Sequence, residues 1–262
     1  MLRCAAPMLV QMLWRERTGK LNLFYDLEYW AQNSKTADTP FLMFEDRVWT
    51  FRQGLEETLR HGAWLRETLG IKKDEIVAMD FMNSDAFIFV WMGLWSIGAK
   101  PAFINYNLTG QALVHCARAA GSAIMLVDPQ VAHNVDDVVR AELANVRIEI
   151  FTAEKRREVL AMPPTRLPDE ERAEESLASM ANLIYTSGTT GLPKAAVVSW
   201  GKMHAAGGFP ARLINARPGE IFYTVRTDSF PSFLSQECKS DMCAVYASLP
   251  LLGRHPLLRQ LS

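Results

Sequence analysis

The strongest constraint on the fold is a regular alternation of short apolar segments with longer ones between residues 75 and 151. The short segments have the length of buried strands, and the longer ones have the length of helices. We expect strands at 75–81, 101–105, 123–127 and 146–151, and helices at 86–99, 110–119 and 136–143. This alternation is typical of a mostly parallel sheet with helices on both faces, so we predict an α/β fold. Such sheets bind ligands at the carboxyl ends of their strands.

The flanking segments extend this architecture. Residues 41–51 predict two short strands joined by a tight turn. Thr50 and Gln53 have the spacing of a capping box, which predicts that a helix starts there and ends at Gly70. Residues 161–180 are rich in proline and then acidic, so we expect an exposed connection or a short surface helix.

A run of small residues follows the strand expected at 181–185. Every residue from Thr186 to Gly191 is Thr, Ser or Gly, and Pro193 and Lys194 follow after one leucine. Glycines allow backbone N–H groups to turn toward an anion, hydroxyls add donors, and the lysine adds a positive charge. We therefore predict a phosphate-binding loop. The alternative is a flexible surface linker, which the strands expected on both sides disfavour.

The best-known phosphate loop is the Walker type, G-x-x-x-x-G-K-[ST], and this chain departs from it. Aligned from Gly188, the chain has Pro193 where that motif needs its second glycine. Ala195 stands where the motif needs a hydroxyl for Mg²⁺, and Lys194 alone fits. The sequence therefore disfavours a P-loop nucleotidase.

Charge and cysteine content exclude several other classes of function. The formal net charge of −1 gives no indication of a nucleic-acid partner. The four cysteines show no framework spacing, which indicates free thiols in a reducing compartment. Cys238 and Cys243 are either half of a metal site or incidental thiols, and no second Cys/His pair lies near them in the sequence. We predict no metal site from the protein's own side chains.

The N-terminal segment, residues 1–20, contains an apolar stretch that is too short to cross a bilayer. One interpretation is an interfacial helix that places Arg15, Arg17 and Lys20 at lipid headgroups. The other is a terminal segment packed on its own domain. Residues 86–99 have the length of a buried core helix, so we expect no transmembrane helix in this chain.

Three stretches resemble one known family. TSGTTGLPKAA, Thr186 to Ala196, resembles the phosphate loop of adenylate-forming (AMP-binding) enzymes. Residues 81–116, which include Asn83-Ser84 and end in His115-Cys116, resemble the very-long-chain acyl-CoA synthetase and fatty-acid transport group. Residues 44–53 fit the same group. The resemblance covers residues 21–218.

The resemblance implies a function and a set of ligands. It implies ATP-dependent activation of long- or very-long-chain fatty acids to acyl-CoA through an acyl-adenylate. ATP and Mg²⁺ would be the cofactors, coenzyme A a co-substrate and the fatty acid the substrate. The residues that would bind ATP are Thr186, Ser187, Gly188, Thr189, Thr190, Gly191 and Lys194. The resemblance also implies an intracellular protein associated peripherally with the peroxisomal, reticulum or plasma membrane.

Other parts of the family pattern are not matched. We expect an N-terminal segment at 1–20, a partial AMP-binding domain at 21–218, a divergent tail at 219–262 and no C-terminal lid domain. Leu249–His255 partly resembles the family's aromatic-histidine segment, but its histidine stands at a different position. We predict no catalytic residue in this chain. The fold would then be an incomplete N-terminal domain of the adenylate-forming type. These departures indicate a truncated form, or alternatively an inactive fragment that retains phosphate binding or a partner or membrane interaction.

Overall fold

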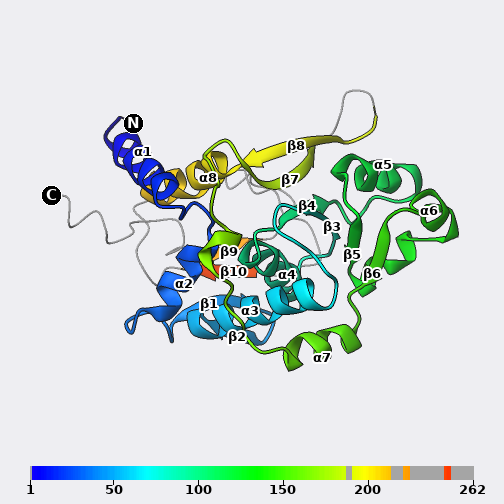
Figure 1. Ribbon diagram of the computed structural model, residues 1–262, viewed down its shortest axis with the longest axis horizontal. Coiled ribbons are helices and arrows are strands. Elements are labelled where there is room, and N and C mark those ends of the chain that lie inside the picture. The colour runs from blue at the N-terminus through cyan, green and yellow to red at the C-terminus, as the bar shows by residue number, and fades with distance from the viewer. Residues whose placement is uncertain (1, 187–190, 214–220, 225–244, 249–262) are drawn as a thin grey trace. The chain divides into compact units, whose positions relative to one another are not determined.

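The computed structural model describes residues 2–186, 191–213, 221–224 and 245–248 (Figure 1). The chain divides into two compact units, and each is described by itself. The first unit comprises Met1–Glu56, Pro168–Ser179 and Ser199–Ser262, and the second comprises Glu57–Leu167 and Met180–Val198.

Helices and strands alternate along the chain from residue 51 to residue 186. The helices are α1 (Leu2–Arg17), α2 (Phe24–Gln32), α3 (Phe51–Glu67), α4 (Asp85–Ser96), α5 (Gly110–Ala120), α6 (Asp137–Glu142), α7 (Ala153–Ala161) and α8 (Trp200–Leu213), with 3-10 turns at Pro129–Asn134 and Asp169–Glu171. The strands are β1 (Pro40–Phe44), β2 (Arg47–Thr50), β3 (Ile76–Asp80), β4 (Lys100–Ile104), β5 (Ile124–Val127), β6 (Arg147–Ile150), β7 (Met180–Thr186), β8 (Lys194–Ser199), β9 (Ile221–Thr224) and β10 (Val245–Ser248).

The second unit is built on a six-stranded sheet of order β6-β5-β3-β4-β7-β8. Strand β3 pairs in parallel with β4 and with β5, so that Met79 lies between Phe103 and Leu126. Strands β6 and β7 also pair in parallel with their inner neighbours, β5 and β4. The predicted α/β fold with a mostly parallel sheet is therefore confirmed.

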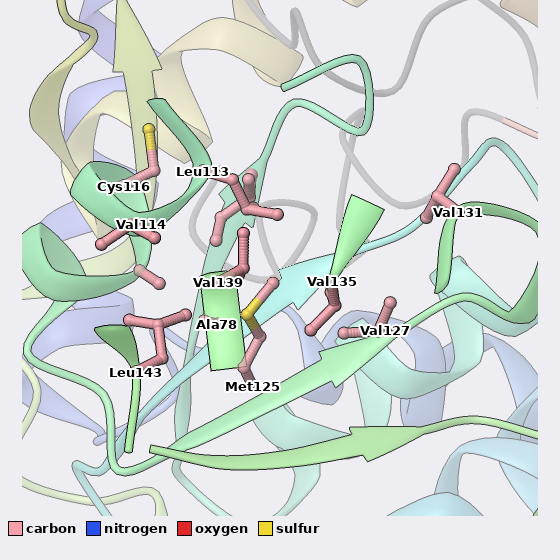
Figure 2. Close-up of a cluster of buried hydrophobic side chains, with 12 residues drawn as sticks. Ala78, Leu113, Val114, Cys116, Met125, Val127, Val131, Val135, Val139 and Leu143 are labelled. Atoms are coloured by element: carbon pink, nitrogen blue, oxygen red, sulfur yellow. The ribbon is translucent and has the colours of Figure 1, made fainter. Parts of the chain in front are cut away.

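One face of this sheet is covered by α5 and α6. Ala78 of β3, Met125 of β5 and Cys116 of α5 are all fully buried in one cluster. Figure 2 shows that the cluster extends through the side chains of Val139 and Leu143. Burial of such apolar side chains contributes about 1.5–3 kcal/mol each, so α5 is held firmly on the sheet.

Helix α4 covers the opposite face with aromatic side chains. The rings of Phe87 and Trp91 lie 5.2 and 4.9 Å from the ring of Phe103 on β4. Ser84 caps the helix by accepting a hydrogen bond from the N–H of Phe87. Burial of α4 on nearly every side confirms the buried core helix expected at 86–99.

The first unit contains a four-stranded sheet of order β2-β1-β10-β9. The predicted hairpin is present, because β1 and β2 pair in antiparallel fashion around Glu45, whose φ is +51°. The capping box is also confirmed: Gln53 Oε1 accepts from the Thr50 N–H at 2.9 Å, and Thr50 Oγ1 accepts from the Gln53 N–H at 3.3 Å. Strand β10 lies in a stretch where the sequence showed no strong element.

Helix α1 packs within the first unit by means of charged residues. Arg15 is 5% exposed and donates to the Asp26 carboxylate, and Glu16 accepts from the backbone N–H of Leu177. The interpretation that placed Arg15 at lipid headgroups is therefore wrong, because its guanidinium is used to bind α2. In the part of the chain that the structure describes, no helix has the length and hydropathy needed to cross a bilayer.

Candidate functional site

The candidate site lies at one edge of the six-stranded sheet. Strands β3, β4, β5 and β7 run parallel, so their carboxyl ends meet at the same edge. Asp80 ends β3, Asp128 follows β5, and Tyr185 and Thr186 end β7. Ligand sites of parallel sheets form at this edge.

The predicted phosphate loop connects β7 to β8 there. Thr186 ends β7, and Lys194 begins β8. The hydroxyl of Thr186 donates to the carbonyl of Lys194 at 3.4 Å, which joins the two stems of the loop. Ser187, Gly188, Thr189 and Thr190 lie outside the described residues, so the structure brings together only the Thr186, Gly191 and Lys194 members of the predicted set.

Gly191 and Lys194 have the conformation and exposure that a phosphate loop needs. The φ angle of Gly191 is +91°, a conformation that residues with a Cβ rarely adopt. Nothing lies within 4 Å of the position where its Cβ would be, so the glycine is required by the backbone angle rather than by crowding. The Lys194 side chain is exposed, and within the described part of the chain no ion pair engages its ammonium.

Helix α5 contacts both stems of the loop. On the β7 side, the hydroxyl of Tyr185 donates to the backbone carbonyl of Cys116 at 2.6 Å. Burial raises the pKa of Tyr185, so this hydroxyl keeps its proton throughout the physiological range. On the β8 side, the ring Nε2 of the half-buried His115 is 2.9 Å from the carbonyl oxygen of Pro193. The Nε2 atom donates, since a carbonyl oxygen can only accept.

A buried carboxyl group that the sequence analysis missed lies at the same edge. Asp80 is fully buried, and neither of its carboxyl oxygens has a hydrogen-bond partner among the described residues. Burial, together with the nearby Asp128 carboxylate, raises the pKa of Asp80 to about 7. The sequence did carry a signal for this group. Asp80 directly follows the apolar residues 76–79, and an ionisable residue at the end of a buried strand is a candidate site residue.

The described residues contain no cluster of three or more His, Cys, Asp or Glu side chains able to hold a metal ion. Cys116 is a free and buried thiol, and its burial raises its pKa to about 11, so it is a poor nucleophile or metal ligand. Cys238 and Cys243 and the Leu249–His255 segment lie outside the described residues.

Comparison with known proteins supports one family. The model of the AMP-binding enzyme family matches residues 29–249. A very long-chain fatty acid transport protein from Cochliobolus heterostrophus is 33% identical over 194 residues, which cover 74% of this chain and 30% of that protein. Long-chain fatty acid transport protein 2 from Rattus norvegicus is 30% identical, over 64% of this chain and 28% of the rat protein.

Solved structures share the fold at lower identity. An anthranilate CoA ligase in complex with anthranoyl-AMP matches with a TM-score of 0.62 and 22% identity, over 72% of this chain and 37% of the ligase. A fatty acyl CoA synthetase from Mycobacterium tuberculosis matches with a TM-score of 0.61 and 20% identity, over 73% of this chain and 37% of the synthetase. The chain thus spans about a third of the length of the proteins that it matches.

Proposed function

Because the chain belongs to the AMP-binding enzyme family, we propose that it acts in the ATP-dependent activation of long- or very-long-chain fatty acids to acyl-CoA through an acyl-adenylate. The observation that carries the proposal is the stem of the Thr186–Lys194 loop. An exposed lysine, without an ion pair among the described residues, follows a glycine of positive φ at the carboxyl edge of a parallel sheet. That combination of backbone freedom and positive charge suits a polyphosphate.

The proposed role of the loop is to hold the phosphates of ATP. The backbone and hydroxyl donors of the loop would surround the β- and γ-phosphates, and the Lys194 ammonium would neutralise part of their charge. The donors come from Thr186, Ser187, Gly188, Thr189, Thr190 and Gly191. The fatty carboxylate attacks the α-phosphorus while the bond to pyrophosphate breaks, and the thiol of coenzyme A then takes the acyl group. Such a displacement depends on positioning and charge neutralisation more than on covalent help from the protein.

The long-chain acyl substrate is proposed from the relatives. The relatives from Cochliobolus heterostrophus and rat are named as very long-chain and long-chain fatty acid transport proteins. Mg²⁺ would be supplied with ATP, and we assign it no side-chain ligand here because the described residues offer no cluster that fits it.

A second candidate function is binding without chemistry, at a membrane surface. The exposed side of α1 carries Leu9, Val10, Leu13 and Trp14, which are between 39% and 53% exposed. These residues recur at helical spacing and form one apolar stripe, which we call the α1 stripe. Arg17, also exposed, follows it. An apolar helix face that ends in tryptophan and arginine is typical of helices that lie at a lipid interface.

The experiment that tests the proposed function uses the purified 262-residue chain. Binding of MgATP is measured by calorimetry, and pyrophosphate release is measured with ATP and oleate. We expect Lys194→Ala to weaken MgATP binding about 10-fold or more, because a charged hydrogen bond contributes about 1.5–3 kcal/mol.

The matched control is Lys72→Ala, which removes an exposed lysine near the opposite end of the sheet, before β3. Equal loss of binding in both variants, or no binding by the wild-type chain, would contradict the proposal. Binding of MgATP without pyrophosphate release would contradict catalysis by this chain while supporting the proposed phosphate-binding role of the loop.

A further inference from the structure

Two hydrogen bonds from side chains to backbone carbonyls restrain the exposed lysine of the loop. The carbonyl of Pro193, on one side of Lys194, receives a hydrogen bond from His115 at 2.9 Å. The carbonyl of Lys194 itself receives one from the Thr186 hydroxyl at 3.4 Å. Each carbonyl belongs to a rigid peptide plane, and the two planes meet at the Lys194 Cα. Holding both planes sets the φ and ψ angles of Lys194 and therefore the direction of its side chain.

Helix α5, which carries His115, is packed tightly against the sheet. Residues on both sides of His115, Val114 and Cys116, are 2% and 0% exposed in the core between α5 and the sheet. The helix ends at Gly121, whose φ of +65° allows a left-handed C-cap. Because α5 is packed in this way, the position of the His115 ring is defined by the core.

The Tyr185 contact holds the other stem to the same place. Its hydroxyl donates to the carbonyl of Cys116, the residue next to His115 in the chain. Two consecutive residues of α5 therefore contact the two stems of the loop: His115 contacts Pro193, and Cys116 contacts Tyr185. This pair of contacts is called the α5 clamp below.

We propose that His115 is a positioning residue that directs the Lys194 side chain toward bound phosphate, with Tyr185 fixing the opposite stem as the second point of the α5 clamp. This inference rests on the proposed phosphate-binding function of the loop. Neither residue touches the phosphate in this proposal. His115 acts through the backbone carbonyl of Pro193 in the loop, and Tyr185 acts through the backbone carbonyl of Cys116 in α5.

The first test measures the affinity of the full chain for a fluorescent ATP analogue. We expect His115→Ala and Tyr185→Phe each to raise the Kd about 5- to 10-fold, as expected for loss of one hydrogen bond. His115→Gln keeps an N–H donor at similar reach and should restore the Kd to within about twofold of the wild type. The control His133→Ala removes an exposed histidine of the same unit and should leave the Kd unchanged. Failure of the glutamine variant to rescue would overturn the positioning role.

The second test does not require nucleotide. Hydrogen exchange of the backbone amides of Gly191–Ala196 is followed by mass spectrometry in the unliganded chain. His115→Ala should accelerate this exchange, while exchange in β3 and the urea midpoint stay as in the wild type. Unchanged exchange at Gly191–Ala196 would overturn the α5 clamp. If the wild-type chain binds no nucleotide but exchange responds as expected, the proposed function is contradicted. The α5 clamp would then restrain the loop stems without any role in phosphate binding, and the positioning role of His115 would be overturned.

Discussion

The guanidinium of Arg15 and the carboxylate of Asp26 form a buried ion pair, with Nη1 of the arginine 2.9 Å from Oδ2 of the aspartate. The pair joins α1 to α2 at a place where both side chains have lost nearly all contact with water. Removing one member leaves an uncompensated charge in the core, which is more costly than never having buried the pair.

We therefore expect Arg15→Met to lower the free energy of unfolding of the first unit by about 3–5 kcal/mol. The double variant Arg15→Met with Asp26→Leu removes both charges and should recover most of that loss. Urea denaturation followed by tryptophan fluorescence measures both changes. A double variant as unstable as the single one would contradict this account of the pair.

Asp80 is expected to make stability fall as pH rises. In the unfolded chain the carboxyl ionises near pH 4, whereas burial raises its pKa in the folded chain to about 7. Between these values the unfolded state loses its proton first, so ionisation favours unfolding, and the cost reaches about 1–4 kcal/mol above pH 7. Asp80→Asn should be more stable than the wild type at pH 8 and equal to it near pH 4.

The measurement for Asp80 is a series of urea unfolding curves between pH 4 and pH 8. Asp137→Asn, an exposed aspartate of α6, serves as the control and should give a nearly constant difference across the series. A pH-independent effect of Asp80→Asn would mean that the carboxyl is ionised in the folded chain.

Gly93 is expected to be intolerant of alanine because two helices meet there. A Cβ at this position would lie 2.8 Å from the Cβ of His61 and 3.1 Å from the backbone nitrogen of Gly62, both on α3. Neither atom can rotate away, so α3 and α4 must move apart, at a cost of about 1–3 kcal/mol. In an open helix the same change would stabilise by up to about 1 kcal/mol. The sign of the shift in thermal midpoint for Gly93→Ala therefore decides whether the helices are in contact.

The α1 stripe is expected to bind lipid. Replacing Leu13 and Trp14 with serine removes two of its four apolar side chains and should reduce sedimentation of the chain with anionic vesicles several-fold. Val138→Ser alters a more exposed apolar residue in the second unit and should leave vesicle binding intact. Equal binding by all three proteins would show that the stripe has no part in lipid association.

Much of the second unit could be predicted from the sequence, because its strands are continuous apolar runs separated by well-capped helices. Ser84, Gly121 and the pair Thr50 and Gln53 act through short-range hydrogen bonds or backbone angles, and such local chemistry is visible in a single sequence. The phosphate loop could be predicted for the same reason, since its residue types and the strands around it are local features, and its binding role stays a prediction.

The elements that were missed depend on contacts between distant segments. Helix α7 buries Val159 alone, so it has almost no apolar face to mark it as a helix. Strand β10 is a strand through its pairing with β1 and β9, which lie far from it in the chain. The contact of His115 with Pro193 is equally invisible in the sequence, because it depends on how α5 lies against the loop.

The strand order of the six-stranded sheet has a consequence for the order in which the strands pair during folding. Strands β3, β4 and β5 follow each other closely and pair among themselves, whereas β7 pairs with β4 only after the chain has left the second unit at Leu167 and returned at Met180. Pairings between distant segments form late, because closing the larger loop between them costs more conformational entropy before any stabilising contact is made. We therefore expect β7, together with β8 at its outer edge, to dock last. The stems of the Thr186–Lys194 loop would come together at the end of folding, after β3, β4, β5 and α5 were already in place.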